Sequence, residues 1–111
     1  MNRREKDIWF MEQILIQIDD SQIATIAHKF SIQKISIFGS AIRDDFSPNS
    51  DIDLLIELSP DRAYSYFDVL EIQEQFERIF QRKVDIVEKN SLRNPFRRES
   101  ILRSAKEIYA I

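Results

Sequence analysis

Three short segments rich in β-branched and aliphatic residues constrain the fold of this chain most strongly. They are Lys34–Phe38, Asp51–Leu58 and Lys83–Glu88, and their pattern is typical of short strands. Tyr66–Phe80 lies between the second and the third, and its apolar and amide residues recur at helical spacing. These stripe residues are Leu70, Gln73, Phe76 and Phe80. The alternation predicts an α/β (α+β) fold, with helices packed on a small mixed sheet of three or more strands.

Both ends of the chain carry a helical pattern. In the first third, one apolar face is formed by Ile8, Met11, Leu15 and Ile18. Asp20 or Ser21 can cap a second run, so residues 1–29 are compatible with one helix or with two. A last helix is expected near Phe96–Tyr109. Its expected buried side consists of Ile101, Leu102, Ala105 and Ile108.

Length and composition indicate a single folded domain. The chain has 111 residues, of which 43% are hydrophobic, a globular composition. We expect one domain over 1–111, with 1–20 as a helical extension. The net charge of −3 argues against direct nucleic-acid binding. The absence of cysteine and of a long apolar run favours a cytoplasmic protein without a membrane span.

The single glycine limits where a phosphate group can meet a bare backbone. One glycine excludes the G-x-G-x-x-G fingerprint and the Walker loop. Gly39 follows the first predicted strand and precedes Ser40. Because glycine has no Cβ, a ligand can approach the backbone there, and a hydroxyl at Ser40 adds a donor. Arg43 is placed to neutralise a phosphate.

A pair of aspartates opens the second predicted strand. Asp51 and Asp53 are two residues apart, so both side chains project to one face of a strand. Two such carboxylates repel each other unless a cation lies between them, and oxygen ligands suit Mg²⁺. Asp85 lies in the third strand and faces away from its apolar neighbours Val84 and Ile86. If the strands are adjacent, Asp85 joins the pair as a third carboxylate of a metal site, where two ions can serve phosphoryl chemistry.

The motif Gly39-Ser40, ten residues, then Asp51-Ile52-Asp53 resembles that of the polymerase-β-type nucleotidyltransferases. Within them, the chain is similar to the minimal nucleotidyltransferases (MNT proteins) that act as antitoxins to HEPN-domain toxins. The resemblance implies a polymerase-β-like core. It also implies that Gly39 and Ser40 hold the nucleotide phosphates, and that Asp51, Asp53 and Asp85 are the catalytic metal ligands.

The resemblance further implies an activity. The enzyme would use ATP and two Mg²⁺ ions and would transfer AMP to a tyrosine of a partner HEPN toxin. Two other functions stay open: an antitoxin that neutralises its toxin by binding alone, and a nucleotidyltransferase acting on a small molecule or RNA. Replacement of Asp53 by asparagine distinguishes the enzyme from the binding-only antitoxin. Only the enzyme would lose its neutralisation of the toxin.

Several residues also have plain structural interpretations. The aspartates can be solvated strand residues, and Asp85 can lie on the outer face of an edge strand. The aromatic residues that could flank a nucleotide base are Tyr64, Tyr66 and Phe67, although packing beneath the helix explains them as well. The last helix carries a basic stretch of Arg97, Arg98, Arg103 and Lys106. This stretch is either a solvated face with a Glu99–Arg103 pair or a surface for a triphosphate or a partner.

Overall fold

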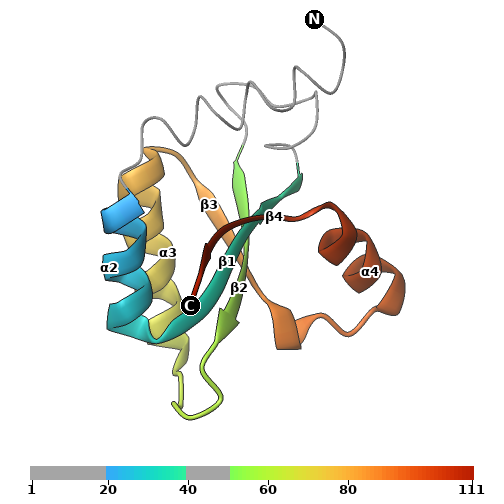
Figure 1. Ribbon diagram of the computed structural model, residues 1–111, viewed down its shortest axis with the longest axis horizontal. Coiled ribbons are helices and arrows are strands. Elements are labelled where there is room, and N and C mark those ends of the chain that lie inside the picture. Colours follow the sequence, from blue (N-terminus) through green and yellow to red (C-terminus); the bar gives the residue numbers. More distant parts are fainter. Residues whose placement is uncertain (1–19, 40–50) are drawn as a thin grey trace, which may run out of the picture.

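The computed structural model describes residues 20–39 and 51–111 (Figure 1). Its main elements, in chain order, are α2 Asp20–Phe30, β1 Ile32–Phe38, β2 Ile52–Leu58, α3 Tyr66–Phe80, β3 Val84–Glu88, α4 Pro95–Ser104 and β4 Lys106–Ala110. A short 3₁₀ helix, η2, covers Lys89–Ser91. The predicted helical face of Ile8–Ile18 and the residues Ser40 and Arg43 lie outside the described residues. None of the helices in the described ranges is long and apolar enough to cross a membrane.

The strands form one mixed sheet in the order β3-β2-β1-β4. β1 pairs antiparallel with both β2 and β4, whereas β2 and β3 are parallel. The parallel pair is connected through α3, as a parallel connection requires. The predicted small mixed sheet with packed helices is therefore confirmed.

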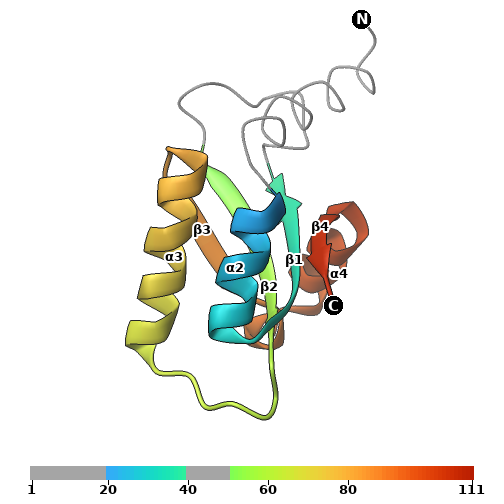
Figure 2. The same ribbon diagram turned by 60° about the vertical axis from the view of Figure 1, so that its left-hand side comes forward.

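Helices cover the two faces of the sheet unequally. α2 and α3 lie side by side on one face, and α4 lies on the other (Figures 1 and 2). The larger core is buried between the sheet and the helix pair, and it fully encloses Ile35, Leu54 and Phe76. The smaller core, beneath α4, consists of Phe38, Leu55, Leu92 and Ile101. Alternation along β2 explains the division, since Leu54 faces the larger core and the next residue, Leu55, faces the smaller one.

The helix predicted over Tyr66–Phe80 has those bounds in the structure. A capping box starts it, in which Ser65 and Asp68 satisfy each other's backbone N–H groups. Gln81 ends it in the left-handed conformation. The buried face is Ile72, Phe76 and Phe80, whereas the predicted stripe residues Leu70 and Gln73 are half-buried.

The prediction of a last helix over Phe96–Tyr109 is wrong in its second half. α4 ends at Ser104, Ala105 is extended with ψ 139°, and Lys106–Ala110 forms the edge strand β4. Ile108 and Tyr109 are half-buried against the larger core. Leu102, expected to be buried, is 40% exposed. The apolar spacing fits a longer helix, but pairing of this segment with β1 overrides that local pattern.

Candidate active site

Two of the predicted carboxylates lie side by side on adjacent strands. Asp53 of β2 is the register partner of Asp85 of β3 in the parallel ladder, and neighbouring strands are about 4.8 Å apart. The flanking partners Ile52 and Val84 are fully buried in the larger core. Because side chains alternate along a strand, both carboxylates project to the opposite face, on which α4 lies. The sequence predicts that a neighbouring strand brings Asp85 beside Asp51 and Asp53, and the ladder places Asp85 beside Asp53.

Asp51 lies just before β2 and is half-buried. The next residue, Ile52, donates its N–H to the carbonyl oxygen of Lys83 at 3.0 Å, which joins the start of β2 to the start of β3. Asp51 does not line the pocket that contains Asp53 and Asp85. Within residues 20–39 and 51–111, no cluster of three or more His, Cys, Asp or Glu side chains is arranged to hold a metal ion. The structure therefore brings together Asp53 and Asp85 but not all three carboxylates.

Gly39 lies against the carboxylate of Asp53. Its φ is +75°, a value that residues other than glycine rarely adopt. A Cβ on residue 39 would lie 2.2 Å from Oδ2 of Asp53 and 3.1 Å from its Cγ. The register explains this contact, because Phe38 is paired with Asp53 across β1 and β2. The bare backbone of Gly39 therefore gives room to one of the two carboxylates.

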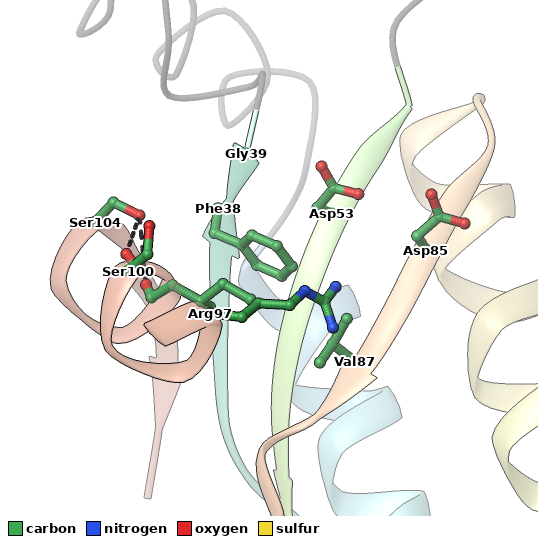
Figure 3. Close-up of a pocket in the computed structure, with 9 residues that line it drawn as sticks. Phe38, Gly39, Asp53, Asp85, Val87, Arg97, Ser100 and Ser104 are labelled. Carbon is green, nitrogen blue, oxygen red and sulfur yellow. Dashed lines mark hydrogen bonds between the residues drawn. The ribbon is translucent and has the colours of Figure 1, made fainter. Parts of the chain in front are cut away.

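A pocket of about 520 Å³ opens between this end of the sheet and α4. This volume lies within the range of about 300–1,000 Å³ that is typical of small-molecule sites. Gly39, Asp53 and Asp85 line it from the sheet (Figure 3). Its lining from α4 consists of Arg97, Ser100, Ile101 and Ser104.

The α4 wall is the part of the site that sequence patterns do not identify. Arg97 is one of four basic residues with two open interpretations, and Ser100 and Ser104 belong to no motif. Their spacing of three and four residues, together with the buried Ile101, is the signal that indicates one helix face turned toward the sheet. Ser104 donates its hydroxyl hydrogen to the carbonyl oxygen of Ser100 at 3.0 Å.

The aromatic residues considered for a nucleotide base do not line this pocket. The Tyr64 hydroxyl donates to the carbonyl oxygen of Phe30 at 2.5 Å, which ties the turn before α3 to the end of α2. Tyr66 and Phe67 are exposed at the start of α3. The start of α3 lies at the opposite end of the sheet from the end of β1, which Gly39 follows (Figure 1). None of the three aromatic residues lines this pocket. Tyr64 is hydrogen-bonded to α2, and the rings of Tyr66 and Phe67 contact each other edge to face.

The donor set fits Mg²⁺ that is shared with a phosphate ligand. Mg²⁺ usually binds one or two carboxylates and completes its coordination with water and substrate phosphate oxygens. Asp53 and Asp85 supply two carboxylates on one open face. A pocket with a basic side chain lies directly beside them. The residues present can thus hold the metal together with a nucleotide.

Comparison with known proteins identifies the family. Residues 21–111 match the family described as "Polymerase beta, Nucleotidyltransferase". The chain belongs to this family. MJ1379 of Methanocaldococcus jannaschii, assigned as a protein adenylyltransferase, is 36% identical over 73 residues, which cover 66% of this chain and 73% of that protein. The match to this nucleotidyltransferase family includes Gly39, Asp51, Asp53 and Asp85 within its bounds.

Solved structures of toxin–antitoxin complexes contain chains with the same fold. A chain of a toxin–antitoxin complex with AMP-PNP has a TM-score of 0.66 and 18% identity, over 85% of this chain and 75% of that one. A chain of the complex between tri-AMPylated Shewanella oneidensis HEPN toxin and its MNT antitoxin has a TM-score of 0.58 and 17% identity, over 83% and 70%. At these identities the likeness establishes the architecture.

Proposed function

We propose that this nucleotidyltransferase is a Mg²⁺-dependent protein adenylyltransferase and the antitoxin of a HEPN toxin. It would transfer AMP from ATP to a tyrosine hydroxyl of that toxin and silence it. The observation that carries the proposal is the in-register pair Asp53–Asp85, which lines a ligand-sized pocket. The protein adenylyltransferase assignment of a relative and the AMPylated toxin bound by a structural neighbour support the choice of donor and acceptor.

The reaction needs little covalent participation by the protein. The tyrosine oxygen bonds to the α-phosphorus while the bond from that phosphorus to the bridging oxygen of pyrophosphate breaks. The electron pair of the broken bond stays on pyrophosphate. Bound Mg²⁺ would neutralise charge that develops on the phosphates. Positioning of the reactants and electrostatic stabilisation then provide most of the rate enhancement.

Each site residue has a distinct part in this scheme. Asp53 and Asp85 would bind the metal on their shared face, with Asp51 as the third predicted ligand. Asp85, on the edge strand β3, would also accept the tyrosine proton on its carboxylate. Gly39 and Ser40 would hold phosphate oxygens, and Arg43 would neutralise phosphate charge. Asp85 is suited to meet an incoming acceptor because it is exposed to solvent at the open side of the sheet.

The test uses the full chain together with a HEPN protein encoded beside its gene. Both are incubated with Mg²⁺ and ATP, and mass spectrometry measures the AMP adduct on toxin tyrosines. We expect an adduct with the wild type and at least a hundredfold slower transfer with Asp53→Asn, since loss of one electrostatic element of an active site costs about 10²–10³ in rate. Asp61→Asn, in the turn before α3, is the matched control and should transfer AMP normally.

The same variants separate the enzyme from the binding-only antitoxin. If the wild type forms no adduct, the proposed transfer is wrong. If Asp53→Asn binds the toxin and still neutralises it in cells, neutralisation occurs by binding. Loss of neutralisation with an intact complex supports the enzyme. Addition of EDTA to the wild type should have the same effect on transfer as Asp53→Asn.

A further inference from the structure

The three arginines of α4 have different surroundings. The Arg98 guanidinium donates to the carbonyl oxygen of Lys89 at 2.9 Å, so it fastens α4 to the turn after β3. Arg103 forms an ion pair with Glu99 on the exposed side of the helix. For the Arg97 side chain, by contrast, the described residues provide no hydrogen-bond or ion-pair partner. Two of the arginines serve the fold, and the third is available for a ligand.

Arg97 is also the arginine of α4 that faces the carboxylate pair. It lines the pocket together with Asp53 and Asp85. Its side chain extends from α4 across the sheet toward Val87 of β3 (Figure 3). Val87 follows Asp85 by two residues, so the two lie on the same face about 6.6 Å apart along the strand. The guanidinium and the carboxylates therefore occupy neighbouring parts of one pocket.

Small side chains keep the space beside Arg97 open. Ser100 and Ser104 follow Arg97 at three and seven residues, so all three lie on one face of α4. A serine at each position leaves room in the pocket that a longer side chain would fill. The Ser100 hydroxyl adds a polar group to the same wall.

The charges of Asp53, Asp85 and Arg97 indicate which class of ligand the pocket can bind. Two carboxylates at one part of the pocket suit a divalent cation, and a guanidinium at the other suits an anion. A metal-bound polyphosphate satisfies both, because some of its oxygens bind the metal and others stay available. Guanidinium groups bind phosphate oxygens through two parallel hydrogen bonds and stay protonated at all physiological pH values.

We propose that Arg97 binds the β- and γ-phosphates of the nucleoside triphosphate and neutralises the pyrophosphate as it leaves. This role rests on the proposed nucleotidyl transfer. When the bond between the α-phosphorus and the bridging oxygen breaks, the electron pair stays on pyrophosphate, and Arg97 balances that charge without giving up a proton. The proposed contacts of Arg97 are with the two terminal phosphates and not with the adenosine or the α-phosphate, so its contribution depends on those two phosphates.

Binding measurements on the full chain test this role without requiring catalysis. Isothermal titration calorimetry compares wild type and Arg97→Gln with three probes in the presence of Mg²⁺: AMP-PNP, pyrophosphate and AMP, the last also by displacement of AMP-PNP. We expect Arg97→Gln to weaken AMP-PNP and pyrophosphate by about 10- to 100-fold, as for lost hydrogen bonds to a charged group. The affinity for AMP should stay unchanged. Arg103→Gln, on the same helix but away from the pocket, is the matched control and should bind all three probes as the wild type does.

The possible results lead to different conclusions. Equal weakening of AMP and AMP-PNP by Arg97→Gln would overturn the proposal, and so would unchanged binding of AMP-PNP. Arg97 is exposed, so the thermal midpoint of Arg97→Gln should match that of the wild type. A selective loss of terminal-phosphate binding supports Arg97 even if no toxin is adenylylated, which would contradict only the proposed acceptor. A wild type that binds no AMP-PNP with Mg²⁺ would overturn both proposals.

Discussion

The carboxylate of Asp53 occupies the space that a side chain on residue 39 would need. The predicted role of this glycine is to leave the backbone bare for phosphate. The structure adds a second demand, because Oδ2 of Asp53 lies close to where a Cβ would be. A substitution at residue 39 therefore displaces a proposed metal ligand as well as any phosphate. The two effects can be separated by removing the carboxylate.

We expect Gly39→Ala to lower the free energy of unfolding by about 1–2 kcal/mol, the cost of a left-handed conformation for a residue with a Cβ. It should also weaken binding of AMP-PNP with Mg²⁺, because the Asp53 carboxylate must move. A double-mutant cycle with Asp53→Ala checks this, using calorimetry for binding and urea unfolding for stability. In the Asp53→Ala background, Gly39→Ala should weaken binding less than it does in the wild type, because only its effect on the phosphate remains. Additive losses in the cycle would contradict the contact.

Among the elements, α3 shows how local sequence sets both bounds of a helix. Its first turn is closed by Ser65 and Asp68, and the N–H of Gln81 donates to the carbonyl oxygen of Glu77 at 2.8 Å beyond its last turn. The backbone N–H of Ser65 donates to the Asp68 carboxylate at 2.8 Å. This bond is the main cause that lowers the pKa of Asp68 below its usual value of 3.8, and the Ser65 hydroxyl and Arg62 act in the same direction.

The cap predicts a pH dependence of stability. Because the pKa of Asp68 is lower in the folded state, the carboxylate stabilises the fold fully above the unfolded value and loses that effect as the pH falls through the folded value. Thermal unfolding of wild type and Asp68→Asn should therefore differ most near neutral pH. The difference in midpoint should shrink as the pH falls below 3.8. A difference that is the same at neutral and acid pH would mean that the charge of Asp68 does not contribute.

Sequence patterns predict the elements whose local signals agree with their tertiary surroundings. The capping residues and the apolar stripe of Tyr66–Phe80 both favour the helix that forms. The segment after Ser104 has no such agreement, since Ile108 fits a helical stripe equally well and becomes strand only by pairing with β1. Asp85 is predictable because alternation fixes its face, whereas Arg97 is not, since its surroundings depend on how α4 crosses the sheet.

At the scale of the whole molecule, the sheet separates two hydrophobic cores that hold different helices. The larger core joins α2 and α3 to the sheet and includes Ile72, which is fully buried. The smaller core holds α4 over the opposite face through Ile101. Ile101 also lines the pocket. The stability of the fold and the shape of the site are thus linked mainly through the smaller core.

Two matched substitutions distinguish the contributions of the two cores to stability and to ligand binding. Ile72→Ala and Ile101→Ala should each lower the free energy of unfolding by about 2–5 kcal/mol, as usual for buried isoleucine. At a temperature where both variants are folded, only Ile101→Ala should also weaken AMP-PNP binding, because α4 and its pocket wall loosen. Urea unfolding and calorimetry measure the two effects. If Ile72→Ala weakens binding equally, the cores are not separable.

The pairing of β4 with β1 has a consequence for synthesis on the ribosome. β1 is synthesised before the other strands of the sheet. Its partner β4 is separated from it in the chain by β2, α3, β3 and α4. A nascent chain that has reached β3 already carries Asp53 and Asp85, but it lacks the helix that closes the pocket over them. Translation therefore supplies the two carboxylates before the helix that walls the pocket, so a chain translated only as far as β3 has the acidic pair without the cavity.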